Sequence, residues 1–119
     1  MSYIHDAKRP VTLRSHPIDP NSTDWVVFSY GTDLLSTESI TAHSALIDGG
    51  TIVTDSVYLG DMTDEEGNEH TECYGVQFSV TEGSSSVSVT HRTSRSIAGA
   101  PVLSRLAIDR TAVIPVKSL

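Results

Sequence analysis

The sequence predicts an all-β fold, a small antiparallel β-sandwich preceded by an extended N-terminal arm. Two observations predict it: apolar and polar residues alternate in four short runs, and turn-forming residues separate these runs. The runs are Ile40-x-Ala42, Val53-x-x-x-Val57-x-Leu59, Val76-x-Phe78-x-Val80 and Val87-x-Val89. A period of two gives each strand one face for a core and one for water or a partner. Several such runs separated by turns are typical of a sandwich or barrel.

Length and composition set the broad class. The 119 residues fit one domain, and a net charge of -7 disfavours nucleic acid because like charges repel. A single cysteine, Cys73, excludes an internal disulfide and a thiolate zinc cluster, and we expect it to be half-buried. No apolar stretch reaches membrane-spanning length. We expect the scattered basic residues to lie at solvated strand ends and in ordinary ion pairs: Lys8, Arg9, Arg92, Arg95, Arg105 and Arg110.

The chain divides into an arm, residues 1–18, and a sandwich domain, residues 19–119. Prolines in the arm remove backbone donors and favour extended conformations, so it is expected outside the core, as a functional arm or a disordered tail. Within it, Val11 and Leu13 are candidates for a short edge strand. The turn signal Asp19-Pro20 opens the domain.

The strands of the domain follow from the turns between them. Residues 25–28 predict a buried strand. Residues 38–47 and 51–59 predict a hairpin around Asp48-Gly49-Gly50, and residues 74–81 and 86–93 predict a second one around the turn at 82–85. One or two final strands are expected over residues 103–116, with Pro115 on an edge and a short helical turn over 103–110 as the competing prediction. The predicted core comprises Trp25, Val27, Ile40, Val57, Phe78, Val80, Val87, Val89, Leu106 and Ile108.

The residues show no pattern for catalysis, and we predict no catalytic, cofactor-binding or metal-binding residue. The acidic segment 61–72 has the end-to-end spacing of a calcium loop, but Glu66 occupies the position that needs glycine. A solvated inter-strand loop is therefore expected there, with weak binding of a divalent ion as the alternative. The histidines lack metal-ligand spacing, and no nucleophile-elbow or phosphate-binding motif occurs.

Hydroxyl and amide side chains alternate along two predicted strands, at Gln77, Ser79 and Thr81 and at Ser86, Ser88 and Thr90. These nearly uncharged faces suit another protein chain, a carbohydrate or water.

Short motifs along residues 19–109 give the chain a resemblance to a known group. They are Trp25 after Asp24, Asp33-Leu34-Leu35, Glu38-Ser39-Ile40-Thr41, Val87-Ser88-Val89-Thr90-His91-Arg92-Thr93-Ser94 and Arg105-Leu106-Ala107-Ile108. This arrangement resembles the small immunoglobulin-like (Ig-like) proteins of tailed bacteriophages that act as fiber–tail adaptors or neck connectors. The chain departs from their pattern at Ser86, where they tend to have Tyr, and by its acidic segment 61–72 and its arm.

The resemblance implies a structural protein of the virion without catalysis or cofactors, made in the bacterial cytoplasm and placed in the neck or tail. Its partners would be copies of itself in a ring, of six or twelve, and other neck, tail or fiber proteins. No nucleic acid, membrane or small-molecule substrate is expected. Both termini are expected to order on neighbouring chains, through Tyr3, Ile4, Val11, Leu13, Val113, Ile114, Val116 and Leu119.

A second class stays open, a carbohydrate-binding or adhesin-like β-sandwich. Such modules usually present exposed aromatic rings for stacking on sugars. With Trp25 expected in the core, the candidates for stacking are Tyr30, Tyr58 and Tyr74.

Overall fold

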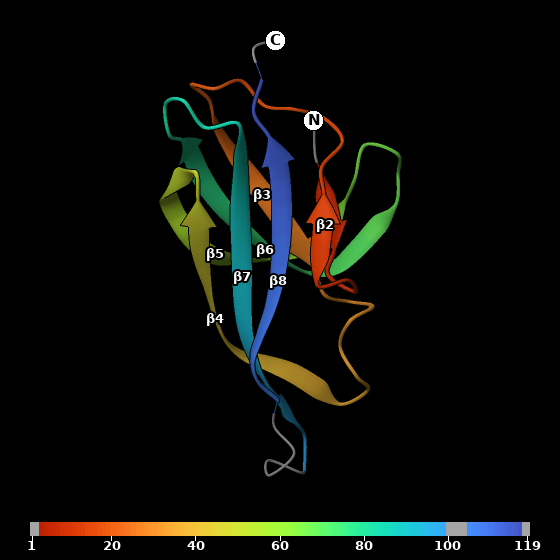
Figure 1. The fold of residues 1–119 in the computed structure, drawn as a ribbon. Coiled ribbons are helices and arrows are strands. Elements are labelled where there is room, and N and C mark those ends of the chain that lie inside the picture. The colour runs from red at the N-terminus through yellow and green to blue at the C-terminus, as the bar shows by residue number, and fades with distance from the viewer. Residues whose placement is uncertain (1–2, 100–104, 118–119) are drawn as a thin grey trace.

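The computed structural model describes residues 3–99 and 105–117. Within them, two four-stranded sheets pack face to face (Figure 1), which confirms the predicted all-β sandwich. The first sheet has the order β1-β3-β6-β5 and the second β2-β8-β7-β4. The strands are β1 (Ile4–Asp6), β2 (Val11–Leu13), β3 (Thr23–Ser29), β4 (Glu38–Asp48), β5 (Gly50–Thr63), β6 (Glu69–Val80), β7 (Ser86–Ile97) and β8 (Arg105–Pro115).

The strand order is that of an immunoglobulin domain. If β1 and β3 to β8 are lettered A to G, the sheets become ABED and CFG, the constant-type arrangement, with β2 added beside β8. One difference concerns direction. β1 runs parallel to β3 and β2 runs parallel to β8, so both sheets are mixed and not purely antiparallel.

Both predicted hairpins are wrong, because each turn carries the chain from one sheet to the other. β4 lies in the second sheet and β5 in the first, and β6 and β7 are divided in the same way. At the first crossing, Gly49 has φ 84°, and a Cβ there would lie 2.4 Å from the Ser86 carbonyl oxygen. The close approach of the two crossings therefore requires glycine. The antiparallel partner of β5 is instead β6, across the acidic loop.

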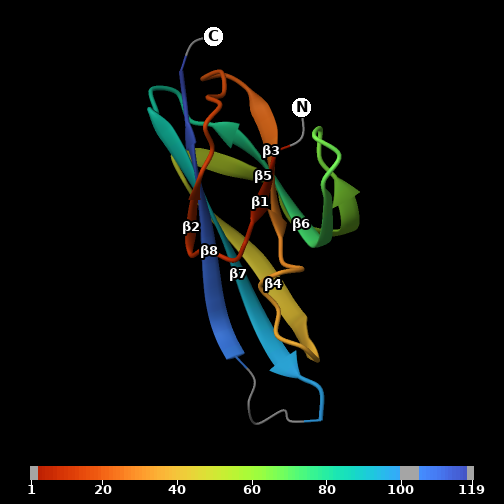
Figure 2. The same cartoon turned by 90° about the vertical axis from the view of Figure 1, so that its right-hand side faces the viewer.

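The N-terminal segment is extended, but it pairs with its own chain. β1 and β2 lie on the same side of the sandwich, one in each sheet (Figure 2). The buried side chains of Ala7 and Ile18 join the core, and the Ile18 N–H donates to the Pro115 carbonyl. Residues 4–6 and 11–13 therefore find their strand partners within the same molecule and not on a neighbour.

The final segment forms one strand in the described residues, β8, in place of the helical turn. β8 lies between β2 and β7, so the prediction that Pro115 occupies an edge strand is wrong. β2 pairs with β8 only over residues 111–113, so Pro115 lies beyond that pairing.

The predicted core is correct in part. Val27, Phe78, Val87 and Val89 are buried. Ile40, Val80 and Ile108 are half-buried, and the side chain of Leu106 lies outside the described residues.

The prediction that Trp25 and Val57 lie in the core is wrong, because these residues are 40% and 36% exposed. The cause is strand phase. Trp25 pairs with Gln77 and Val57 pairs with Gly75 on the outer face of the first sheet, whereas the alternate residues Val26 and Phe28 face the core.

Cys73 is fully buried, not half-buried, and burial raises the pKa of its thiol.

Candidate functional site

Three of the predicted assembly contacts meet on one edge of the second sheet. Leu13 pairs with Val113, and Val11 lies two residues before Leu13 on the same face of β2. Val11 and Leu13 are 55% and 76% exposed, although both are large apolar side chains. We call Val11, Leu13 and Val113 the edge strip. Val11 and Leu13 lie on the outermost strand, β2, and Val113 lies on the adjoining strand, β8.

The same row of the sheet ends in an exposed apolar residue at its opposite edge. In the strand register, Val11 pairs with Thr111, Thr111 with Thr90, and Thr90 with Leu46 on β4. Leu46 is 51% exposed. The second sheet therefore has an exposed apolar side chain at each of its two edges, at the same level.

A hollow of about 430 Å³ lies beside the edge strip. Tyr3, Ile4 and Leu13, all predicted contacts, line it, together with Arg14 and the acidic turn at residues 64–66. The Arg14 guanidinium lies 4.1 Å from the centre of the Tyr3 ring, a cation–π contact that fixes the wall of the hollow.

Of the other three predicted assembly contacts, Ile114, Val116 and Leu119, the first two belong neither to the edge strip nor to the hollow. Ile114 is completely buried, so its assignment as an assembly contact is wrong: β8 alternates, with Ala112 and Ile114 inward and Val113 outward. Val116 packs against the core, and Leu119 lies outside the described residues.

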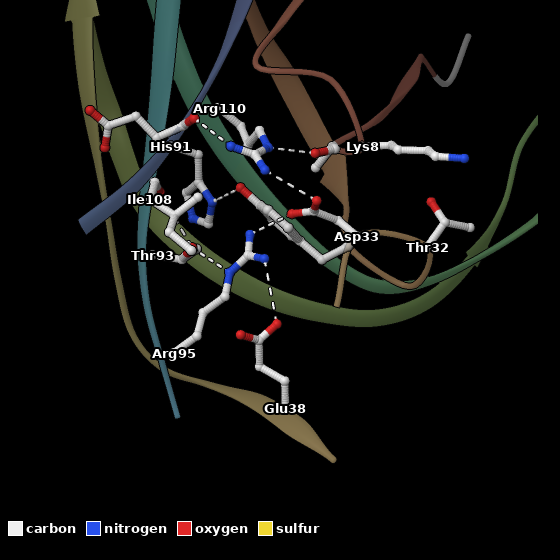
Figure 3. A network of polar contacts seen from close by, with 12 residues as sticks. Lys8, Thr32, Asp33, Glu38, His91, Thr93, Arg95, Ile108 and Arg110 are labelled. Atoms are coloured by element: carbon white, nitrogen blue, oxygen red, sulfur yellow. Dashed lines mark hydrogen bonds and ion pairs between the residues drawn. The ribbon is translucent and has the colours of Figure 1, made fainter. Parts of the chain in front are cut away.

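A buried ionic network joins the loop after β3 to β7 and β8 (Figure 3). Arg95 has a fully buried side chain, and its Nη2 lies 2.6 Å from Asp33 Oδ2. The other oxygen of Asp33 lies 3.1 Å from Arg110 Nη2, and Glu38 Oε1 lies 3.8 Å from Arg95 Nη1. Arg110 also donates to the Ala7 carbonyl at 2.6 Å. The network thus fastens the N-terminal segment and the loop after β3 to the second sheet.

The prediction of solvated basic residues is wrong for Arg95, which is fully buried, and for Arg110, which is half-buried. The signal was present in the alternation of β7. Val87 and Val89 face the core, and the same phase places His91, Thr93 and Arg95 inward, all with no exposed surface. Extending the period of two along the strand would have placed Arg95 in the interior.

A β-bulge in β5 directs polar side chains toward the second sheet. The strand register shifts between Thr54 and Val57. In this bulge, Asp55 Oδ1 accepts the Ala45 N–H of β4 at 3.0 Å, and the Ser56 hydroxyl lies within hydrogen-bond distance of His91 Nε2 and His43 Nδ1. Bulges commonly redirect side chains in this way.

Hydrogen bonds link Tyr30, His91 and Ser56 in a chain, and their direction shows whether His91 could act as a base toward the Ser56 hydroxyl. The Tyr30 hydroxyl lies 2.6 Å from His91 Nδ1, burial raises the pKa of Tyr30, and burial lowers the pKa of His91 to about 4. A protonated phenol donates to Nδ1 of a neutral imidazole, which places the imidazole proton on Nε2. His91 then donates to the Ser56 hydroxyl through Nε2, so His91 in this tautomer cannot act as the base that accepts the serine proton.

The acidic loop closes the hairpin of β5 and β6. Asp64 Oδ1 accepts the backbone N–H groups of Glu66 and Asn68, each at 2.9 Å, and Asp64 Oδ2 lies 2.9 Å from His70 Nε2. The His70 hydrogen bond holds the pKa of Asp64 below its usual value. Across residues 3–99 and 105–117, no group of three or more His, Cys, Asp or Glu side chains is arranged to hold a metal ion.

Comparison with protein-family models, with curated proteins and with solved structures gave no match. No helix in the described ranges is long and apolar enough to span a bilayer.

Proposed function

We propose that this chain is a non-enzymatic structural protein of a tailed-phage virion, an adaptor in the neck or tail that joins the portal or tail to fibers and assembles as a ring. The motifs between residues 19 and 109 support the virion role by resemblance. The single structural observation that carries the assembly role is the edge strip, where Leu13 is 76% exposed on the outermost strand of a sheet.

The two edges of the second sheet suit head-to-tail contact. Contacts between two different surfaces generate rings when the rotation between copies closes. If β2 of one copy lies beside β4 of the next, Val11 meets Leu46 at the same level of the sheet. Each contact covers apolar surface that is exposed in the single chain, and ring closure adds the contacts together.

The size of the assembly tests this proposal. Native mass spectrometry of the full chain, alone and with its neck or tail partners, should give a closed oligomer. Leu13→Lys and Leu46→Lys should each dissociate it, because each places a charge at the apolar contact. The matched control is Val53→Lys, which changes a residue that is 55% exposed on β5 of the first sheet. A chain that stays monomeric in every mixture contradicts the ring.

The virion role has its own test. Deletion of the coding sequence from the phage genome that carries it should give particles whose heads and fibers are not joined, and supplying the protein should restore them. Normal, infectious particles without the protein would overturn the adaptor role.

The alternative, a carbohydrate-binding module, is favoured by one observation, the exposure of Trp25. This residue lies on the first sheet, whereas the edge strip belongs to the second, so the two functions are compatible in one chain.

A further inference from the structure

On the outer face of the first sheet, the paired residues form three uncharged rows, of which the third is largely covered, because Val27 is 8% exposed and Gly75 is buried. The strand register of β3, β6 and β5 defines them. From one end they are Thr23, Ser79 and Thr51, then Trp25, Gln77 and Thr54, then Val27, Gly75 and Val57. We call these rows the tryptophan face. An uncharged face of this extent stands out on a chain with net charge -7.

Trp25 occupies the middle row and packs over a glycine. A Cβ on Gly75 would lie 3.2 Å from Trp25 Cε3 and 2.7 Å from Leu59 Cδ1. The absence of a side chain at Gly75 therefore lets the indole lie against the sheet backbone. The indole remains 40% exposed and Leu59 37% exposed, so an aromatic surface is held in place and open to a ligand.

Hydrogen-bonding groups lie in the same row. The Thr54 hydroxyl donates to Gln77 Oε1 at 2.9 Å, which orients the amide. The Gln77 amide nitrogen has no acceptor among the described residues. Since neighbouring strands lie about 4.8 Å apart, the row from Trp25 to Thr54 spans about 10 Å.

We propose that the tryptophan face binds a neutral saccharide. The C–H faces of a sugar ring stack on an indole, while its hydroxyls accept from an amide and exchange hydrogen bonds with threonine and serine. The net charge of the chain repels polyanions, and the three rows offer no carboxylate to a cation. The face offers an aromatic ring for stacking and, beside it, amide and hydroxyl groups for hydrogen bonding. The ligand that best matches this chemistry is neutral and rich in hydroxyl groups.

The chain carries its own reporter for this proposal. Trp25 is the only tryptophan of the sequence, so intrinsic fluorescence reads the face directly. Titration of the full chain with the neutral oligosaccharides cellohexaose and maltohexaose should change the Trp25 emission and saturate. The polyanion heparin, which the net charge of the chain repels, should leave the emission unchanged.

Three variants assign the site, with binding measured by calorimetry where the fluorophore is removed. Trp25→Ala should weaken binding about tenfold or more, and Trp25→Phe should retain part of it. Gln77→Ala should weaken binding about fivefold, the value of one net hydrogen bond. The control Leu13→Lys lies on the edge strip and should bind sugar normally, so loss of assembly and loss of sugar binding are measured separately.

Thermal unfolding of each variant separates a damaged fold from a damaged site. The proposal is overturned if neither hexasaccharide binds, if only a charged polymer binds, or if folded Trp25→Ala binds as well as the unchanged protein.

Discussion

The Tyr30 hydroxyl and His91 Nδ1 lie 2.6 Å apart in the interior, and neither residue has any exposed surface. Tyr30 follows β3 of the first sheet, and His91 belongs to β7 of the second, so the bond crosses the sandwich. On its other side, His91 contacts Ser56, whose second partner, His43, is exposed. The core thus contains a neutral histidine that is linked to the surface through hydrogen bonds.

This arrangement predicts a dependence of stability on pH. Because burial lowers the pKa of His91 to about 4, the unfolded chain binds a proton at this residue below pH 6.5 while the folded chain does not. Stability is therefore complete above about pH 6.5 and falls as the pH drops toward 4, by up to about 3 kcal/mol. Urea unfolding at about pH 7 and about pH 4.5 measures the loss. In His91→Asn the loss should be smaller, and an equal loss would show that other groups cause it.

Removing the central carboxylate of the ionic network should be costly. Asp33→Ala leaves the guanidinium groups of Arg95 and Arg110 without their shared partner, and Arg95 is fully buried. Breaking such a buried pair typically costs about 3–5 kcal/mol. Chemical unfolding should show this loss. The control is Asp109→Ala, which breaks an exposed pair with Arg92 and should change the midpoint little.

Two aromatic truncations should differ strongly. Phe78 is fully buried, so Phe78→Ala should cost about 3–5 kcal/mol of unfolding free energy. Trp25→Ala should cost clearly less, because the indole is already 40% exposed in the folded chain. Equal losses in thermal or urea unfolding would place the indole in the core.

Gly75→Ala tests the packing beneath Trp25. The added methyl group meets the ends of two side chains, Leu59 Cδ1 at 2.7 Å and Trp25 Cε3 at 3.2 Å, and not the backbone. Since these ends can move, we expect a loss of about 1–2 kcal/mol and an altered Trp25 emission. Unchanged emission would show that the indole does not lie against Gly75.

The sequence by itself determined that the fold is all-β, because a period of two has only one regular structure that satisfies it. It also identified much of the core, including Phe78, Val87 and Val89, and it placed Val11 and Leu13 on a short edge strand. These are local properties of strands, so alternation along the chain is enough to state them.

Only the tertiary structure decided how the strands connect and which faces meet. A turn at Asp48-Gly49-Gly50 reverses the chain equally well within one sheet or between two, so local turn chemistry does not distinguish a hairpin from a crossing. The run of residues 25–28 is apolar in both phases, and only pairing with β6 directs Val26 and Phe28 inward and Trp25 outward. The buried network of Asp33, Arg95 and Arg110 depends on contacts between residues more than 60 positions apart along the chain. Charges enter an interior only when such partners meet, because the cost of leaving water must be offset by ion pairs and hydrogen bonds that form in the assembled fold.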